Sequence, residues 1–156
     1  MPKKQPAPTP VSTGFWLLKS EPDMFSWAMQ KARGKTGEPW TGVRNYLARN
    51  NMRAMKLGDL AFFYHSNEGK EIVGIVKVIV PARPEPGDES GTWECVDVAA
   101  VCDLKRPVTL TAVKANAKLA QMALVTSMRL SVQPVTAAEW ALVCTMGGLD
   151  PRRVKA

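Results

Sequence analysis

Short runs of apolar residues separated by polar turns make up most of this chain. Four such runs, at residues 15–18, 60–64, 72–80 and 92–101, have the length and composition of β-strands. The run at 72–80 is almost entirely apolar and β-branched, which suits a strand covered on both faces. Residues 81–91 are rich in proline, glycine and acidic side chains, and are predicted to form an exposed loop.

Helical spacing of apolar residues predicts four short helices. Residues 25–32, 43–56 and 109–120 show this spacing. The strongest signal begins at Thr136, where Thr136-x-x-Glu139 is a capping box and two glycines further on can end the helix. Because strands and helices do not alternate regularly, the pattern indicates an α+β fold, built on a small mixed β-barrel with short flanking helices.

Residues 127–132 alternate between polar and apolar side chains and are predicted to form a further strand. Its even positions, from Met128 to Val132, are expected to face the core. Arg129 and Ser131 lie on the opposite, polar face, which is a candidate ligand surface.

The chain has the length of one domain. Its 156 residues suit a protein with a single buried core. Residues 14–149 are predicted to form that domain, between a flexible proline-rich extension at 1–13 and a basic C-terminal tail at 150–156. The first residues lack the apolar stretch of a secretory signal, and no run approaches the roughly 18–20 apolar residues that span a bilayer. We therefore expect a cytoplasmic protein without a membrane partner.

Signatures of catalysis and of metal binding are largely missing from the sequence. The three cysteines form no C-x-x-C pair and are expected to be small buried hydrophobic residues. The single histidine, His65, excludes any site that needs two imidazoles, and neither a phosphate-binding glycine loop nor a nucleophile elbow is present. Glu21 and Asp23 are interpreted as a turn stabiliser and a helix N-cap. We expect no catalytic residue, no metal and no cofactor.

The net charge of +7 is unevenly distributed along the chain. Residues 31–56 carry seven basic residues and one acidic residue, Glu38, whereas residues 83–103 carry six acidic residues and one basic residue, Arg83. This asymmetry predicts a molecule with one basic side and one acidic side. A polyanion such as nucleic acid is expected to prefer the basic side.

One face of the predicted helix at 43–56 gathers basic side chains. Asn45, Arg49, Arg53 and Lys56 recur on that face at helical spacing. We predict phosphate contacts for the three basic residues of this set. A solvated helix face without a ligand would show the same spacing, so both interpretations stay open.

Aromatic residues beside the basic segment are candidates for base stacking. Of the five tryptophans, Trp16, Trp93 and Trp140 are expected in the core. Trp27 and Trp40 flank the basic segment, where either core packing or stacking on an unpaired base would explain them. The residues that follow Trp40 add a glycine, a guanidinium and an amide, which are groups that allow backbone approach, grip phosphate and read a base edge.

Several short motifs occur together in a fixed order. They are K-S-E-P at 19–22, W-x-G-V-R-N at 40–45, F-Y-H-S-N at 63–67, I-V-G-I at 72–75 and R-L-S-V at 129–132. In this order and spacing they resemble the EVE domain family over nearly the whole predicted domain. The resemblance implies a PUA-like β-barrel related to the YTH domain. It also implies a pocket for a flipped modified base, of the 5-methylcytosine or 5-hydroxymethylcytosine type.

The resemblance further implies which residues line that pocket. By motif they are Lys19, Ser20 and Pro22 at its edge, Trp40, Val43, Arg44 and Asn45 in one wall, Tyr64, His65, Ser66 and Asn67 in another, and Arg129 and Ser131 closing it. Trp27 is added as the second stacking candidate. Phe25 departs from the family pattern, in which a tyrosine is common at this place.

The expected partner is nucleic acid, and two alternatives accompany the interpretation as a reader of modified DNA. One is an RNA-binding module, because PUA-like barrels also serve RNA. The other is a small hydrolase or nucleotide-modifying enzyme, for which Glu21, His65 and Ser66 would have to lie in one pocket. The sequence makes no prediction about protein partners.

Overall fold

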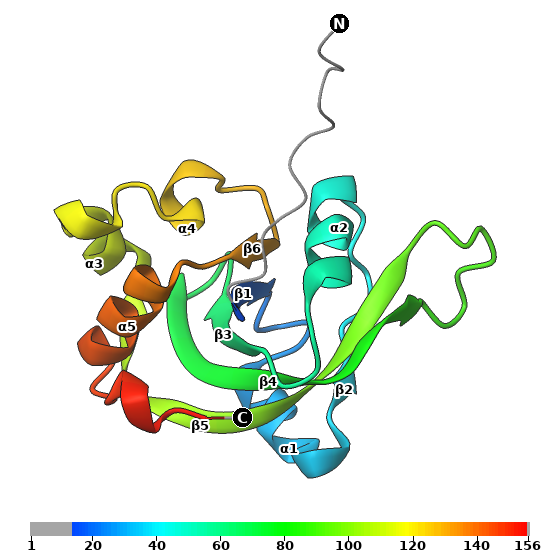
Figure 1. Cartoon of the computed structure of the whole chain (residues 1–156), viewed down its shortest axis with the longest axis horizontal. Coiled ribbons are helices and arrows are strands. Elements are labelled where there is room, and N and C mark those ends of the chain that lie inside the picture. The colour runs from blue at the N-terminus through cyan, green and yellow to red at the C-terminus, as the bar shows by residue number, and fades with distance from the viewer. Residues whose placement is uncertain (1–13, 156) are drawn as a thin grey trace, which may run out of the picture.

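The computed structural model describes residues 14–155, so the predicted extension at 1–13 lies outside the described residues. At the centre is one six-stranded sheet with the strand order β2-β5-β4-β3-β1-β6 (Figure 1). The strands are β1 (Phe15–Ser20), β2 (Glu38–Pro39), β3 (Leu60–His65), β4 (Glu71–Pro84), β5 (Glu94–Thr109) and β6 (Val132–Pro134). β1 and β3 pair in parallel and the other neighbours are antiparallel, so the sheet is mixed.

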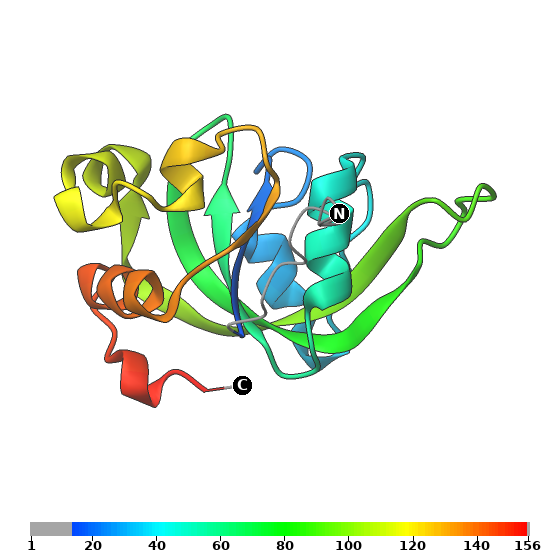
Figure 2. The ribbon, with the colours of Figure 1, turned by 45° about the horizontal axis from the view of Figure 1, so that its top comes forward.

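Five α-helices and three short 3-10 helices occur within residues 14–155. They are α1 (Trp27–Ala32), η1 (Gly34–Thr36), α2 (Tyr46–Ala54), α3 (Leu110–Ala115), η2 (Ala117–Leu119), α4 (Ala123–Thr126), α5 (Ala137–Met146) and η3 (Pro151–Arg153). Figure 2 shows α1 and α2 on one side of the strongly curved strands β4 and β5, and α3, α4 and α5 on the other. None of these helices is long and apolar enough to cross a membrane.

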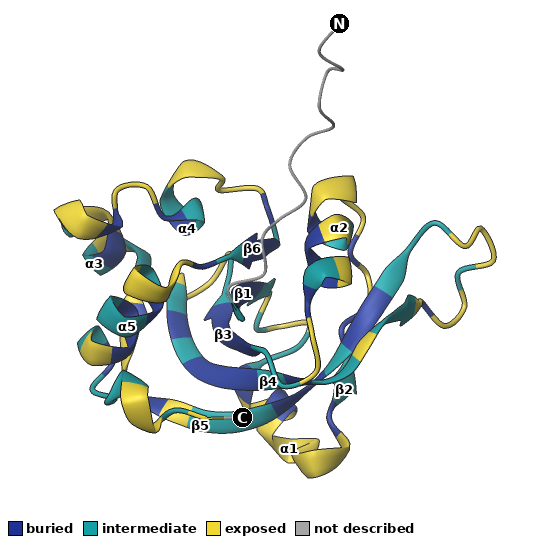
Figure 3. Cartoon of the chain, in the orientation of Figure 1, coloured by how far each residue is buried: buried dark blue, intermediate teal, exposed yellow. Residues whose placement is uncertain are grey.

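Alternate residues of the central strands face two separate hydrophobic clusters. In β1, Trp16 and Leu18 belong to the cluster packed with α1 and α2, and Leu17 belongs to the cluster packed with α3, α4 and α5. In β3, Phe63 belongs to the first of these clusters and Phe62 to the second. Figure 3 shows these strands as the buried centre of the molecule. The expectation of a single core is therefore wrong, because helices cover both faces of the sheet and two apolar layers are buried.

Most of the predicted elements are present. All four strands predicted from apolar runs are found, and β4 and β5 are longer than predicted. The capping box of Thr136 and Glu139 opens α5 with both of its hydrogen bonds. The first helix begins at Trp27, two residues later than predicted, because the side chain of Ser26 accepts a hydrogen bond from the N–H of Met29 and caps it.

Two predicted helices are shorter than expected because asparagine side chains interrupt them. Asn45 accepts a hydrogen bond from the N–H of Ala48 at 2.9 Å, so it is the N-cap of α2 and not part of the helix. Asn116 accepts a hydrogen bond from the N–H of Lys118 and caps η2, so the helix predicted at 109–120 is broken there. Asparagine favours such caps over helix interiors because its side chain competes for backbone groups.

The strand predicted at 127–132 is wrong over its first part. The N–H of Leu130 donates to the carbonyl of Ser127 at 3.0 Å and closes a turn, and strand β6 begins only at Val132. Met128, which was expected in the core, is 58% exposed. Alternation over only six residues is a weak signal for a strand, and the first of these residues form the turn that connects α4 to β6.

The loop predicted at 81–91 begins later than expected. β4 continues to Pro84, which lies opposite Glu94 of β5. Proline is tolerated in this part of the strand because the register shifts between Val80 and Arg83, and irregular positions need fewer backbone donors. The remaining hairpin between β4 and β5 projects from the body of the molecule (Figure 1).

Candidate functional site

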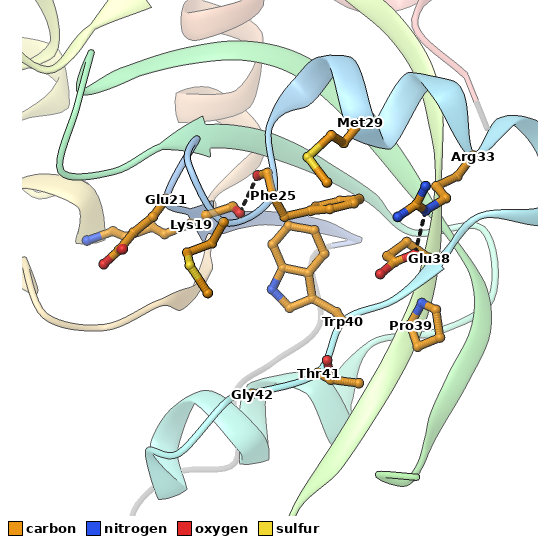
Figure 4. Close-up of a pocket in the computed structure, with 12 residues that line it drawn as sticks. Lys19, Glu21, Phe25, Met29, Arg33, Glu38, Pro39, Trp40, Thr41 and Gly42 are labelled. Carbon is orange, nitrogen blue, oxygen red and sulfur yellow. Dashed lines mark hydrogen bonds and ion pairs between the residues drawn. The ribbon is translucent and has the colours of Figure 1, made fainter. Parts of the chain in front are cut away.

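A groove of about 500 Å³ opens beside the end of β1. One side is formed by the connection from β1 to α1 and by α1 itself, and the other by β2 and the residues after it (Figure 4). The lining residues are Lys19, Ser20, Glu21, Met24, Phe25, Met29, Arg33, Glu38, Pro39, Trp40, Thr41 and Gly42. Of the predicted pocket residues, the groove therefore brings together Lys19, Ser20 and Trp40.

Aromatic rings form the floor of the groove. The ring of Trp40 meets Phe25 edge to face at a centroid distance of 6.2 Å, and it meets Phe63 in the same way at 5.5 Å. Only 7% of Trp40 is exposed, so it offers the groove a small contact area. No described residue accepts a hydrogen bond from its indole N–H, and the group is left as a donor for a ligand.

A charged pair borders the same floor. The guanidinium of Arg33 lies 5.5 Å from the centre of the Phe25 ring and forms an ion pair with Glu38 at 2.8 Å. Figure 4 shows this pair on the α1 and β2 side of the groove. Ser20 is tied down on the β1 side, where its hydroxyl donates to the carbonyl of Phe25 at 2.6 Å.

Trp40 is positioned by residues far away in the sequence. Its backbone N–H donates to the carbonyl of Val96 at 2.7 Å, which fixes it to β5. Two residues later the N–H of Gly42 donates to the buried carboxylate of Glu85 at 2.6 Å, and Arg44 forms an ion pair with the same carboxylate at 2.6 Å. The hydrogen bond from Arg44 is the main reason why the pKa of Glu85 is lowered.

The W-x-G-V-R-N motif therefore supports Trp40 more than it lines the groove. Val43 is buried in the cluster under α2, Arg44 is bound to Glu85, and Asn45 caps α2. None of these three residues lines the groove. Their side chains hold Trp40 and the start of α2 in place. The family resemblance had implied that the three residues form a pocket wall together with Trp40.

A second recess, of about 420 Å³, lies next to the start of α2. Asn45 and Leu47 line it on one side, and residues 125–130, which include Arg129, line it on the other. Lys19 connects the two sites, because it lines the first groove and its ammonium donates to the backbone carbonyl of Met128 at 2.5 Å. Of the predicted pocket residues, Lys19, Ser20 and Trp40 thus line the first groove, and Asn45 and Arg129 line the second recess.

Lys19 is also held through its backbone. Its N–H donates to the carbonyl of Ser131 at 3.0 Å, which places Ser131 beside the end of β1. The ammonium group lies 5.9 Å from the centre of the Tyr64 ring. Burial lowers the pKa of Lys19, because the charged form loses part of its hydration.

The predicted wall at 64–67 lies outside the groove. Tyr64 is 3% exposed and packs in the cluster with α5. His65 accepts a hydrogen bond at Nε2 from the backbone N–H of Trp27 at 3.0 Å, and burial lowers its pKa. The N–H of Ser66 donates to the carbonyl of Ser20, and Asn67 is exposed with a φ of 67°.

Trp27 is a core residue. It is 6% exposed, and its indole N–H donates to the carboxylate of Asp103 at 2.7 Å. It does not line the groove, and neither does Pro22. The three residues of the enzyme hypothesis are not gathered either, since Glu21 lines the groove and neither His65 nor Ser66 does.

The predicted separation into a basic and an acidic side is wrong. Basic side chains of the segment 31–56 form ion pairs with acidic side chains of the segment 83–103, because the fold places the two segments against each other. The pairs are Lys31 with Asp103 at 2.9 Å, Arg44 with Glu85 at 2.6 Å and Arg53 with Glu94, whose hydrogen bond measures 2.7 Å.

Arg49 donates to the carbonyl of Thr92 at 2.9 Å. Of the three predicted phosphate contacts, Arg49 and Arg53 are therefore engaged within the protein.

Several residues of the groove were not predicted. Met24, Met29 and Arg33 reach it from the β1–α1 connection and from α1, and Pro39 reaches it from β2. Their only sequence signal is that they stand close to Lys19 or Trp40 along the chain. Phe25 was noted as a departure from the family pattern, and the structure places its ring in the groove floor.

The described residues contain no group of three or more histidine, cysteine or acidic residues that could hold a metal ion. Cys95 and Cys144 are buried, as expected, and Cys102 is half-buried. Burial raises the pKa of Cys144 to about 12, so this thiol stays protonated at neutral pH.

Known proteins resemble this chain over most of its length. The model of the EVE domain matches residues 14–146. Thymocyte nuclear protein 1 of Mus musculus is 36% identical over 171 residues, which cover 89% of this chain and 76% of that protein. A crystal structure of a protein from Agrobacterium tumefaciens is 63% identical with a TM-score of 0.84, covering 87% of this chain and 94% of that one. The crystal structure of human THYN1 in complex with 5-methylcytosine containing DNA is 36% identical with a TM-score of 0.79, covering 85% of this chain and 96% of that one.

A more distant structure has the same fold. The YTH domain of the Zygosaccharomyces rouxii MRB1 protein, solved in complex with N6-methyladenosine RNA, is 16% identical with a TM-score of 0.52 and covers 85% of each chain. Together with the likeness to human THYN1, it confirms the expected PUA-like fold, a mixed sheet with short flanking helices. The family model covers almost all of the described residues, and the chain therefore belongs to the EVE domain family.

Proposed function

We propose that this protein binds nucleic acid and holds a modified cytosine, 5-methylcytosine or 5-hydroxymethylcytosine, in the groove at Trp40. The observation that carries the proposal is the composition of the groove, in which an aromatic floor, an unpaired indole donor and Lys19 lie together. The human relative THYN1 was solved with 5-methylcytosine containing DNA, which supports the same class of ligand for this chain.

The groove offers two kinds of surface to a base. Phe25, Met24 and Met29 are apolar, and Met24 is 73% exposed, so a 5-methyl group has an apolar surface to contact. The N–H of Trp40 and the ammonium of Lys19 are donors, and the edge of a cytosine carries ring-nitrogen and carbonyl acceptors. A methylated cytosine therefore matches both surfaces.

Binding in this groove requires the base to leave the duplex. Extrusion of a nucleotide costs a few kcal/mol, which contacts in the pocket and along the backbone must offset. His65 and Ser66, which the enzyme hypothesis requires, lie outside the groove, and the hydroxyl of Ser20, which lines it, donates to the backbone carbonyl of Phe25. We therefore propose recognition without a covalent step.

Titration of short labelled duplexes by fluorescence anisotropy tests the proposal. The duplexes differ at one position, which is cytosine, 5-methylcytosine or 5-hydroxymethylcytosine. We expect one modified duplex to bind more tightly than the unmodified duplex. Equal affinity for all three would overturn base recognition, and tighter binding of a matched RNA would replace DNA as the proposed polymer.

A conservative variant tests the role of the groove. Trp40→Phe keeps an aromatic ring and removes the indole donor. A net hydrogen-bond contribution of about 0.5–1.5 kcal/mol corresponds to a loss of about 2- to 12-fold in affinity for the modified duplex. Trp140→Phe is the matched control, because no residue in 14–155 accepts a hydrogen bond from its buried indole N–H either, and Trp140 lies in the other hydrophobic cluster. Equal losses in both variants would show that the effect does not come from the groove.

A further inference from the structure

Basic side chains that form no ion pair with a described residue gather beside β4 and β5. A recess of about 330 Å³ is lined by Lys35, Lys77 and Lys155 and by apolar residues of β4 and β5. No acidic residue lines this recess within the described part of the chain. None of the three lysines forms an ion pair with a described residue, in contrast to Lys31, which is bound to Asp103.

A second recess adjoins the first at Lys155. It measures about 610 Å³, and Lys105 and Arg153 add two further positive charges to its lining. Among residues 14–155, Asp150 is the only acidic residue in this lining, and it already lies within 3.8 Å of Arg153. Figures 1 and 2 both show the C-terminal segment beside β5. The two recesses, called here the basic surface, thus carry five basic side chains and one acidic side chain.

The basic surface lies next to the proposed base groove. Arg33 lines the groove, and Lys35, two residues further along the chain in η1, lines the basic surface. On the sheet, Glu38 of the groove pairs with Val98 of β5. The next residue, Ala99, faces the opposite side of the strand and lines the basic surface, so the two sites lie around the β2 edge of the sheet. Each strand of a duplex carries one phosphate for about every 3.4 Å of helix axis, so a nucleic acid with one base in the groove would bring neighbouring phosphates to this surface.

We infer that the basic surface binds the phosphodiester backbone of the nucleic acid whose base occupies the groove. The inference rests on the proposed function. It assigns the contacts with phosphate to the basic surface, of which only Lys35 belongs to the segment 31–56. Lysine ammonium groups act as point charges toward phosphate, and they read no sequence. The basic surface thus supplies affinity and the groove supplies discrimination.

The test compares two double variants that change the net charge equally. Lys35→Gln with Lys77→Gln removes two charges from the basic surface. Lys114→Gln with Lys118→Gln removes two exposed charges from α3 and η2, and neither lysine lines the basic surface. Affinity for cytosine and 5-methylcytosine duplexes is measured over a range of salt concentrations. The slope of log affinity against log salt changes by about 0.9 for each phosphate that the protein no longer neutralises.

We expect the first double variant to lower the salt slope and to weaken both duplexes by the same factor, and the second to change neither. An unchanged slope in the first variant, or equal changes in the two variants, would overturn the inference. The ratio of the two affinities in the unaltered protein tests base recognition separately, so the groove and the basic surface can fail independently. Binding to phosphatidylserine vesicles without binding to oligonucleotides would assign the basic surface to a membrane and overturn the inference.

Discussion

The indole ring of Trp27 lies directly against the backbone of Gly74. A Cβ atom at Gly74 would come within 2.2 Å of Trp27 Cζ2, a distance that real Cβ atoms essentially never show. The register of β4 with β5 shifts at the same place, between Ile72 and Gly74. The missing side chain lets α1 approach the sheet, and α1 carries Met29, and Arg33 directly after its last residue, to the groove. Gly74 is thus the position of β4 against which Trp27 docks.

Gly74→Ala is therefore expected to destabilise the protein. Overpacking of a filled core typically costs about 1–3 kcal/mol, and urea unfolding measures this difference. In a double variant with Trp27→Phe, the smaller ring leaves room for the new methyl group, so the cost of Gly74→Ala should be smaller. A Gly74→Ala protein as stable as the unaltered one would mean that Trp27 does not dock at this position.

Features that depend on neighbours in the sequence could be predicted. The strands follow from short apolar runs, and the capping box at Thr136 follows from two residues three apart. The shared motifs indicated the family and hence the PUA-like fold. These signals are local or are carried by the order of motifs, and neither requires knowledge of which distant segments touch.

The groove and the charge distribution depend on distant contacts and could be predicted only in part. Lys19, Ser20 and Trp40 were predicted, whereas Met29 comes to the groove through the docking of α1. The segment 31–56 was expected to present its charge to solvent. Pairing of β5 with β2 and packing of α2 on β5 bring acidic partners to it, and these contacts join residues about 40 to 70 positions apart.

His65 is expected to make folding stability depend on pH. It accepts a hydrogen bond from the N–H of Trp27, and burial lowers its pKa below the usual 6.5, although Glu71 opposes this shift. As the pH falls below 6.5 the unfolded chain takes up a proton that the folded chain does not, so stability is lost until the pH reaches the lowered pKa. One such proton changes stability by at most about 1.4 kcal/mol for each pH unit.

Urea unfolding at a series of pH values, with unaltered protein and His65→Gln, measures this dependence. His65 is the only histidine of the chain, so no other imidazole titrates in this range. We expect the slope below pH 6.5 to flatten in the variant. A slope of the same size in both proteins would show that His65 does not cause it.

Asn45 is expected to stabilise α2 as its N-cap. Asn45→Ala removes the acceptor for the N–H of Ala48 and should cost about 0.5–2 kcal/mol in urea unfolding, whereas Asn45→Ser keeps a capping oxygen and should cost less. The ratio of affinities for modified and unmodified duplexes should stay unchanged in the folded serine variant. A smaller ratio in that variant would show that Asn45 takes part in base recognition, and would place the base site in the recess that Asn45 lines together with Arg129.

Arg53 is expected to contribute little to phosphate binding, contrary to the prediction from its helical spacing. Its guanidinium donates to the carboxylate of Glu94 at 2.7 Å, and a phosphate would have to compete with this partner. Arg53→Ala should therefore leave the salt slope of duplex binding nearly unchanged, whereas Lys77→Gln should lower it by about 0.9 if that lysine neutralises one phosphate. Both variants change the charge by one unit, so they control for each other. If Arg53→Ala lowers the slope as much as Lys77→Gln does, the ion pair with Glu94 opens when nucleic acid binds, and α2 belongs to the phosphate-binding surface.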